Sequence, residues 1–149
     1  MTDSPDVVAP VPGKVVALAD VPDPVFAQQI VGSGVAIDPE RSPGTAVSPV
    51  AGRLLKLHPH AFVVLTAAGQ GVLVHLGIDT VQLDGEGFEL VAAEGDELAS
   101  GDPIVRWDPA AVEADGRSPI VPVVVMDTAA DTVSAAAVGS TVQIGDPLF

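Results

Sequence analysis

The sequence of 149 residues lacks cysteine altogether and has only five aromatic residues, four Phe and one Trp. The absence of cysteine excludes disulfide bonds, thiolate metal ligands and a cysteine nucleophile within this chain. No apolar run approaches the roughly 18–20 residues needed to cross a bilayer, and residues Met1–Asp6 are acidic where a signal peptide is basic. We therefore expect a cytoplasmic protein with no membrane insertion.

Basic residues are also scarce. Six Lys and Arg stand against 20 Asp and Glu, which gives a net charge of −14. Binding to nucleic acid or to an anionic membrane surface needs a cationic patch that displaces counterions, so this composition argues against both. An acidic surface serves solubility in general, and it also fits a protein partner with a positive docking face.

Glycine and proline are abundant, with 15 Gly and 14 Pro, and they separate short runs rich in Val, Ala, Leu and Ile. Many turns between short β-branched runs are typical of an all-β domain. The pattern predicts strands at Val7–Val11, Lys14–Leu18, Gly34–Ile37, Arg53–Leu57, Phe62–Thr66, Gly71–His75, Ile104–Trp107, Ile120–Met126 and Thr141–Ile144. The one predicted helix is Asp108–Ala114, with Asp108 as N-cap and a proline at the first helical position.

Two pairs of segments have similar sequences. Ala9–Val16 resembles Ser48–Leu55, and Leu98–Ile104 resembles Val142–Leu148. These echoes predict a duplicated set of short, largely antiparallel strands, folded into a barrel-like sandwich with at most one or two short helical turns. We expect a short acidic tail over residues 1–7 and a single domain over residues 8–149.

All three histidines, His58, His60 and His75, lie within eighteen residues of one another. If the strands at Phe62–Thr66 and Gly71–His75 form an antiparallel hairpin, His60 lies opposite His75, and cross-strand neighbours are only about 5 Å apart. Such a pair of imidazoles could ligate a metal or handle a phosphoryl group. The sequence has no P-loop pattern that would take phosphate from a nucleotide.

The segment Val74–Phe88, which reads VHLGIDTVQLDGEGF, resembles the active-site signature of the glucose-type IIA components of the bacterial phosphoenolpyruvate-dependent sugar phosphotransferase system. Three further segments are similar to that family in the same order: Asp20–Phe26, Val31–Ile37 and Ser48–Gly52. The resemblance runs from about Val8 to Gly145. It implies a phosphoryl carrier that is not a stand-alone enzyme, with the duplicated all-β fold of the family.

The resemblance also implies the roles of individual residues. His75 matches the phosphorylated nucleophile, His60 matches the histidine that stabilises the phosphoryl group, and the Gly77 carbonyl orients the His75 ring. The phosphoryl donor would be the carrier protein HPr and the acceptor a cysteine of a IIB domain of a sugar permease, so no cofactor is required. Asp23 and Asp79 match carboxylates that face arginines of HPr. The apolar rim of the family's site matches Val25, Phe26, Val31, Leu73 and Val81.

The sequence departs from the family pattern at His58, which stands near a position that is often threonine. A second hypothesis is a zinc-dependent peptidase-like domain that uses His58, His60, His75 and Asp79, ligand types known from enzymes of related fold. The order of its motifs along the chain is reversed here, which argues against it. Binding of regulated permeases or kinases is compatible with the carrier role.

Overall fold

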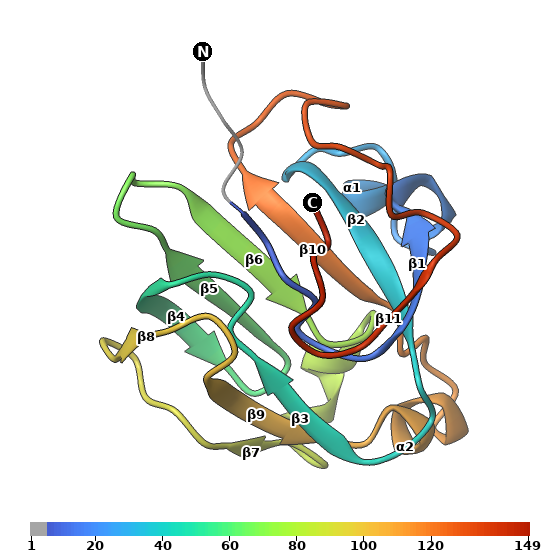
Figure 1. The fold of residues 1–149 in the computed structure, drawn as a ribbon. Coiled ribbons are helices and arrows are strands. Elements are labelled where there is room, and N and C mark those ends of the chain that lie inside the picture. Colours follow the sequence, from blue (N-terminus) through green and yellow to red (C-terminus); the bar gives the residue numbers. More distant parts are fainter. Residues whose placement is uncertain (1–5) are drawn as a thin grey trace.

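Strands make up most of the regular structure in the computed structural model, which describes residues 6–149 (Figure 1). The strands are β1 (Gly13–Ala17), β2 (Gly32–Pro39), β3 (Gly44–Val47), β4 (Gly52–His58), β5 (Ala61–Leu65), β6 (Gly71–His75), β7 (Glu89–Leu90), β8 (Glu97–Leu98), β9 (Pro103–Trp107), β10 (Val121–Met126) and β11 (Thr141–Val142). The helices are short: α1 (Pro24–Ala27) and α2 (Pro109–Ala114), with 3-10 turns η1 (Leu18–Asp20) and η2 (Thr80–Leu83).

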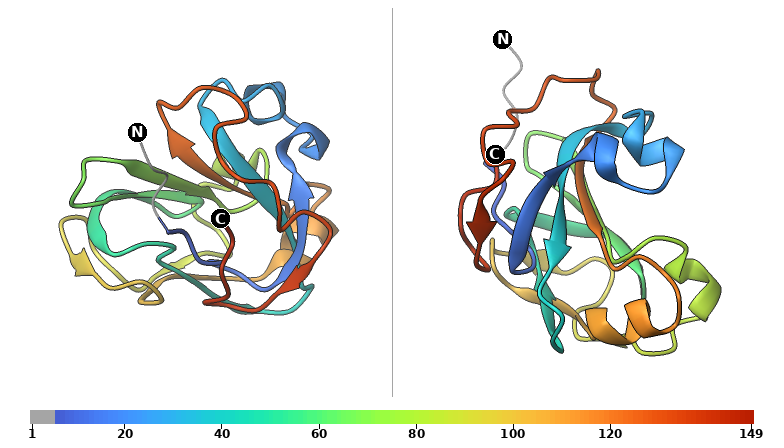
Figure 2. Two further views of the ribbon diagram at one scale, coloured as in Figure 1. Left: turned by 45° about the horizontal axis from the view of Figure 1, so that its top comes forward. Right: turned by 90° about the vertical axis from the view of Figure 1, so that its right-hand side faces the viewer.

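The strands form two antiparallel sheets. The larger sheet has the order β11-β1-β2-β10-β6-β5-β4-β8, and the smaller one has the order β3-β9-β7. The larger sheet curls around the core as a half-barrel, and the smaller sheet lies across its open side (Figures 1 and 2). The predicted all-β class with antiparallel strands and only short helices is confirmed.

The two sequence echoes are structural repeats. Ala9 exchanges backbone hydrogen bonds of 2.8 and 3.1 Å with the Gly145–Asp146 turn, and Ser48 exchanges bonds of 2.8 and 2.9 Å with the Gly101–Asp102 turn. In both turns the glycine has a left-handed φ, 88° and 93°, and the aspartate side chain accepts from the amide three residues earlier at 2.8 Å. Each repeat therefore closes on its own copy of the same turn, as the predicted duplication requires.

Most of the predicted strands are found within a few residues of their expected ends. Val7–Val11 forms only an isolated bridge, Val8 to Pro147, and the last strand is shortened to Thr141–Val142. Strands β3, β7 and β8 and helix α1 were not predicted. Helix α1 has the same N-terminal signal as α2, because Asp23 and Asp108 both cap a helix that begins with proline.

The buried side chains form one large cluster between the sheets and a smaller one beneath α1. The smaller cluster consists of Leu18, Val21, Phe26, Ala36, Ile78 and Val124. The predicted acidic tail falls largely on residues 1–5, which lie outside the described residues. Val7 is already part of the core, because it is 1% exposed and its amide donates to the Phe149 carbonyl at 3.0 Å.

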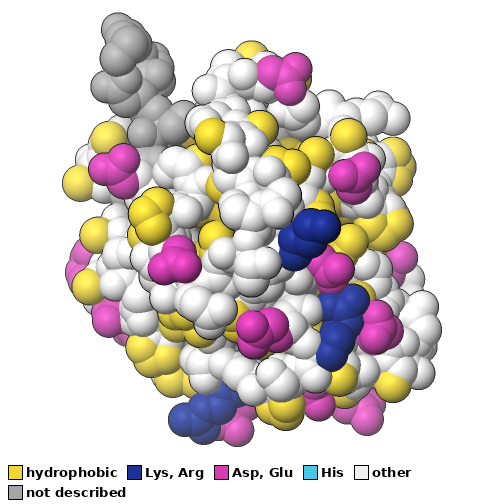
Figure 3. All heavy atoms as spheres, turned by 45° about the vertical axis from the view of Figure 1, so that its right-hand side comes forward, with side chains coloured by type: hydrophobic (Ala, Val, Ile, Leu, Met, Phe, Trp, Pro, Cys, Tyr) yellow, Lys and Arg dark blue, Asp and Glu magenta, His cyan; other side chains and the backbone are white. Residues whose placement is uncertain are grey.

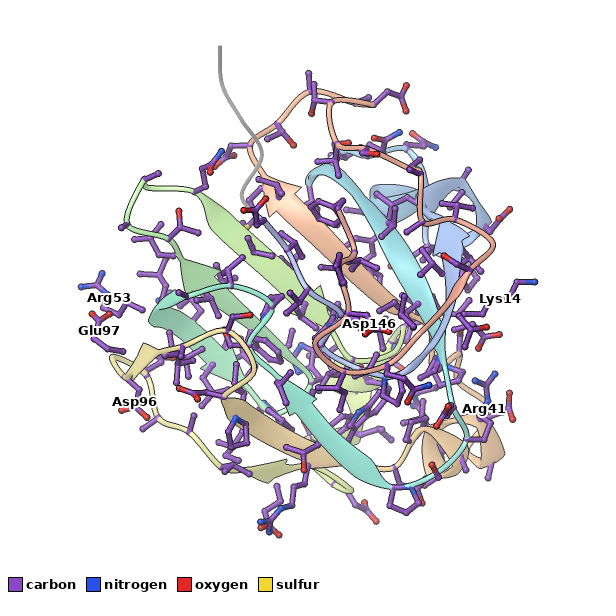
Figure 4. All side chains as sticks on the ribbon, viewed as in Figure 1. Lys14, Arg41, Arg53, Asp96, Glu97 and Asp146 are labelled. Carbon is purple, nitrogen blue, oxygen red and sulfur yellow. The ribbon has the colours of Figure 1, made fainter. Side chains whose placement is uncertain are left out.

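Basic side chains are few on the surface and are surrounded by acidic ones. On the face shown in Figure 3, Asp and Glu outnumber Lys and Arg, and no histidine is visible. Arg41 bonds Asp38 and Glu113 at 2.7 and 3.0 Å, and Arg53 lies opposite Glu97 across β4 and β8 (Figure 4). No helix within residues 6–149 is long and apolar enough to cross a membrane.

Candidate functional site

Strands β5 and β6 bring His60 and His75 together at one end of the large sheet. Their ring centroids are 5.3 Å apart, with the rings inclined at 69°. The predicted register is wrong by one residue, because Ala61 is the cross-strand partner of His75. His60 comes just before β5, and its carbonyl accepts from the Leu76 amide at 2.7 Å. The His60 ring reaches His75 because the chain leaves the regular strand geometry at this point.

The tautomer of His75 follows from its contact with the backbone. Its Nδ1 lies 2.5 Å from the Gly77 carbonyl oxygen. A carbonyl oxygen can only accept, so Nδ1 carries the hydrogen. In the neutral ring this leaves the lone pair on Nε2, which is the atom available as a nucleophile.

Gly77 can present its carbonyl in this way only because it has no side chain. Its φ is +83°, in the left-handed region that favours glycine. A Cβ at this position would lie 2.7 Å from Thr80 Cγ2 and 3.0 Å from the Ser118 carbonyl oxygen. The backbone on both sides is held as well, since the buried Thr80 hydroxyl donates to Leu76 O and the Ile78 amide donates to Ser118 O, both at 2.8 Å.

Both histidines have a pKa below the ordinary value of 6.5. Burial lowers the pKa of His60 to about 4, with smaller contributions from the charges of His75 and His58. Burial also lowers the pKa of His75, and this is opposed by the hydrogen bond to Gly77 and by the negative charges of Asp23 and Asp79. Both rings are therefore neutral near pH 7 in the free protein, and the His75 lone pair is available.

His58, the last residue of β4, stacks on the other side of His60. The two ring centroids are 5.7 Å apart and the interplanar angle is 27°. His58 is exposed, whereas His60 and His75 are half-buried. The three histidines thus form a row from solvent toward the core, with His60 in the middle.

Apolar side chains surround the histidine pair. Phe26 of α1 is buried, and its ring lies 5.3 Å from that of His75. Val31 and Leu73 are half-buried against the small cluster beneath α1. Val25 and Val81 are exposed to 42% and 56%, so they face solvent at the rim.

The two predicted carboxylates are both close enough to His75 for their charges to raise its pKa. The Asp23 carboxylate accepts from the Val25 amide at 2.9 Å and so caps α1. Asp79 is exposed and precedes η2 in the left-handed conformation, with a φ of 60°. All the predicted site residues are thus gathered around one end of β5 and β6 and on the adjoining α1 and η2 segments.

Comparison with known proteins gives a consistent result. The sequence profile of the phosphoenolpyruvate-dependent sugar phosphotransferase system, EIIA 1, matches residues 5–131. The chain belongs to this family. The PTS system glucose-specific EIIA component of Staphylococcus aureus strain N315 is 44% identical over 122 residues, covering 80% of this chain and 72% of that protein. Its counterpart in Staphylococcus epidermidis strain ATCC 12228 is 40% identical over 122 residues.

A solved structure supports the same assignment. Glucose permease IIA from Mycoplasma capricolum superposes on this EIIA chain with a TM-score of 0.87 and 33% identity, covering 99% of this chain and 95% of that one. The chain is therefore an EIIA component of a sugar phosphotransferase system, with the fold of that family.

The zinc-peptidase hypothesis finds no support in this EIIA chain. Within residues 6–149, no group of three or more His, Asp or Glu side chains is arranged to hold a metal ion. His58 stacks on His60, and the His60 ring lies edge-on to that of His75.

Sequence reasoning missed one conspicuous residue of the rim. Ile30 is 67% exposed, the most of any large apolar side chain in the described part of the chain. Its amide donates to Val25 O at 3.0 Å, which fixes it beside the exposed Val25. The signal was present in the sequence, because Ile30 comes directly before Val31 at the edge of a matching segment.

Proposed function

We propose that this EIIA chain carries a phosphoryl group as a phosphohistidine on His75, between HPr and the IIB domain of a sugar permease in the cytoplasm. The observation that supports this most directly is the contact between His75 Nδ1 and the Gly77 carbonyl, which leaves Nε2 as the nucleophile. The lowered pKa of His75 keeps that nitrogen unprotonated near neutral pH.

The proposed transfer needs no cofactor, because each step forms one bond to phosphorus and breaks another. Nε2 of His75 attacks the phosphorus of phospho-HPr, a new N–P bond forms, and the N–P bond to the donor histidine breaks, with the donor imidazole as leaving group. In the second step the thiolate of a IIB cysteine attacks the same phosphorus, and His75 Nε2 leaves. Positioning and charge stabilisation carry the catalysis in such in-line transfers.

His60 is the residue placed to stabilise the charge on the phosphoryl oxygens. Its ring, with the centroid 5.3 Å from that of His75, can turn an N–H toward a group on Nε2. Loss of one preorganised donor typically slows a transfer by about 10²–10³-fold. His60 and His75 are half-buried among apolar side chains. These surroundings would strengthen the interaction of the His60 N–H with the phosphoryl oxygens and would limit hydrolysis of the phosphohistidine.

The rim would bind both protein partners in turn. Asp23 and Asp79 offer negative charge to arginines of HPr, and the net charge of −14 attracts a cationic face over longer distances. The apolar contacts would come from Val25, Phe26, Val31, Leu73 and Val81, to which Ile30 is now added. Regulated permeases or kinases would meet the same face in a phosphorylation-dependent way.

The proposed role concerns sugar uptake in general. The relatives named above are glucose-specific, but the rim described here would meet HPr and IIB and not the sugar itself. The choice of sugar would then be made by the permease.

The test is incubation with labelled phosphoenolpyruvate, enzyme I and HPr. We expect stoichiometric label that is lost in acid and stable in base, as a phosphohistidine requires. Label that survives acid would show a different acceptor and refute the proposal. His75→Gln should not be labelled, while circular dichroism should show an intact fold.

The two histidines can be separated by measuring transfer in both directions. His60→Gln should still accept the phosphoryl group from HPr, more slowly, and should pass it to IIB on the order of 10²-fold more slowly than the wild type. His58→Gln serves as the matched control, since it removes an exposed imidazole from the same row and should have a much smaller effect. If His58→Gln fails and His60→Gln transfers normally, the roles of these two residues are reversed.

A further inference from the structure

The segment that follows His75 is held by a neighbouring loop that is distant from it in the sequence. Residues 115–118 lie between α2 and β10, about 40 positions along the chain from the histidine signature. The Ser118 carbonyl accepts from the Ile78 amide and leaves no room for a Cβ on Gly77. This loop therefore supports the backbone that carries Gly77 and Asp79.

Arg117 is the side chain that joins this loop to the start of η2. Its Nε donates to the Asp79 carbonyl oxygen at 3.2 Å, and one terminal nitrogen donates to Gln82 Oε1 at 3.0 Å. The other terminal nitrogen bonds the Asp115 carboxylate, which fixes the guanidinium on its own loop. A planar guanidinium with five donors can make all three bonds at once, which a lysine ammonium on a flexible stem does not reproduce.

One of the residues that Arg117 bonds, Asp79, has a left-handed backbone conformation. Asp79 has a φ of 60° and a ψ of 15°, in the left-handed region that only a few per cent of non-glycine residues occupy, Asp more often than most. The turn that follows is closed by long backbone hydrogen bonds, 3.2 Å from Gln82 N to Asp79 O and 3.3 Å from Asp84 N to Val81 O. Within η2, Val81 is 56% exposed. Beyond the buried Thr80, this side of the rim thus rests on a short turn with long backbone hydrogen bonds.

We propose that Arg117 is a positioning residue that holds η2, and with it Asp79 and Val81, in the conformation that docks the protein partners. The inference rests on the proposed carrier function and adds a residue that the histidine signature does not contain. Arg117 touches neither the phosphoryl group nor the histidines, and it acts through the backbone of Asp79 and the side chain of Gln82.

The geometry separates this effect from the chemistry of His75. The Gly77 carbonyl that sets the His75 tautomer is fixed by bonds that do not involve Arg117, those of Thr80 and Ile78. Loss of Arg117 should therefore weaken docking and leave the reactive nitrogen as it is. If η2 then occupies the docking conformation about a tenth of the time, the half-saturating concentration rises about tenfold and the maximal rate is kept.

The sign of this effect excludes a simple charge explanation. Removal of Arg117 makes the rim more negative and frees the Asp115 carboxylate, which by electrostatics alone would strengthen the binding of a cationic donor. A weaker interaction must come from lost positioning. Arg53→Gln is the matched control, because it removes the same charge beside Glu97 (Figure 4). Arg53 is the second residue of β4, whereas His58 is the last.

The experiment compares wild type, Arg117→Gln, Arg117→Lys, Gln82→Ala and Arg53→Gln. Transfer from phospho-HPr is followed by rapid quench over a range of HPr concentrations. We expect Arg117→Gln to raise the half-saturating concentration about tenfold with a maximal rate within about twofold of wild type. Arg117→Lys and Gln82→Ala should fall between Arg117→Gln and wild type, and Arg53→Gln should match wild type.

A second readout does not depend on phosphoryl transfer. In Arg117→Gln the amides of Gln82 and Asp84 should exchange with solvent faster than in wild type and Arg53→Gln, while the nitrogen chemical shifts of His75 stay unchanged. The inference would be overturned if Arg117→Gln and Arg53→Gln had the same half-saturating HPr concentration and the same amide exchange rates at Gln82 and Asp84. Wild type that takes no label from HPr would refute the carrier function, and amide exchange would still decide whether Arg117 holds η2. Should Arg117→Gln fail to fold, Arg117→Lys and Gln82→Ala carry the same comparison.

Discussion

Replacement of His60 should reduce the loss of unfolding free energy that the protein undergoes between pH 7 and pH 5. The folded-state pKa of His60 is about 4 against an ordinary value of 6.5, so between these values the unfolded chain binds more protons than the folded one. The contribution of the neutral ring to stability is fully present above pH 6.5 and is lost as the pH falls toward 4. His60→Gln removes this titration and should retain more of its stability at pH 5.

The size of the effect follows from the two pKa values. Linkage gives a loss of about 2 kcal/mol between pH 7 and pH 5 for a shift of this size. The ring of His60 is only half-buried, so solvent screening reduces this figure, and we expect about 1 kcal/mol. His75, whose pKa is also lowered, contributes with the same sign in both wild type and His60→Gln.

The assay is urea unfolding at pH 7 and pH 5 of wild type, His60→Gln and His58→Gln. Wild type should lose about 1 kcal/mol more unfolding free energy between the two pH values than His60→Gln does. His58→Gln should retain most of the wild-type loss, because its ring is exposed and it leaves the half-buried imidazole in place. Equal losses in wild type and His60→Gln would refute the reasoning that burial keeps His60 neutral.

Three further predictions concern the rim and the turn after His75. Asp79→Arg should slow transfer from HPr without changing the unfolding midpoint, and the wild-type rate should fall as salt rises, because rim charges act mainly on association; an unchanged rate at low salt would show that docking occurs elsewhere. Gly77→Ala should destabilise the protein by about 2 kcal/mol or more in chemical denaturation, because it combines a left-handed backbone with a Cβ 2.7 Å from Thr80 Cγ2; a loss below half of this would mean that the turn relaxes. Purified protein should be fully phosphorylated in the presence of a chelator, as measured by label incorporation, whereas tight stoichiometric zinc with peptide hydrolysis would favour the peptidase hypothesis.

The strands and the histidine pair were predictable because their signals are local. Runs of β-branched residues between Gly and Pro turns indicate strands wherever they lie in the fold, and the Val74–Phe88 segment pointed to His75 through its resemblance to the family. Helix α1 was predictable by the same rule that found α2, since an aspartate N-cap followed by proline begins both. The one-residue error in the His60 register arose because the alternation of a strand does not hold where the chain turns out of it.

What only the tertiary structure decided are the contacts between distant segments. The Gly77 carbonyl faces His75 because Ser118, more than 40 residues later, lies behind it, and Arg117 reaches Asp79 across 38 positions. The exposure of Ile30 and the lowered pKa of both histidines depend on which surfaces the curled sheet buries. Composition, turn residues and sequence motifs depend only on residues that are close together in the sequence, so the sequence alone is enough to identify them. The tautomer, the pKa values and the support of η2 depend on what lies next to a residue in space, and that is determined only when the sheet closes.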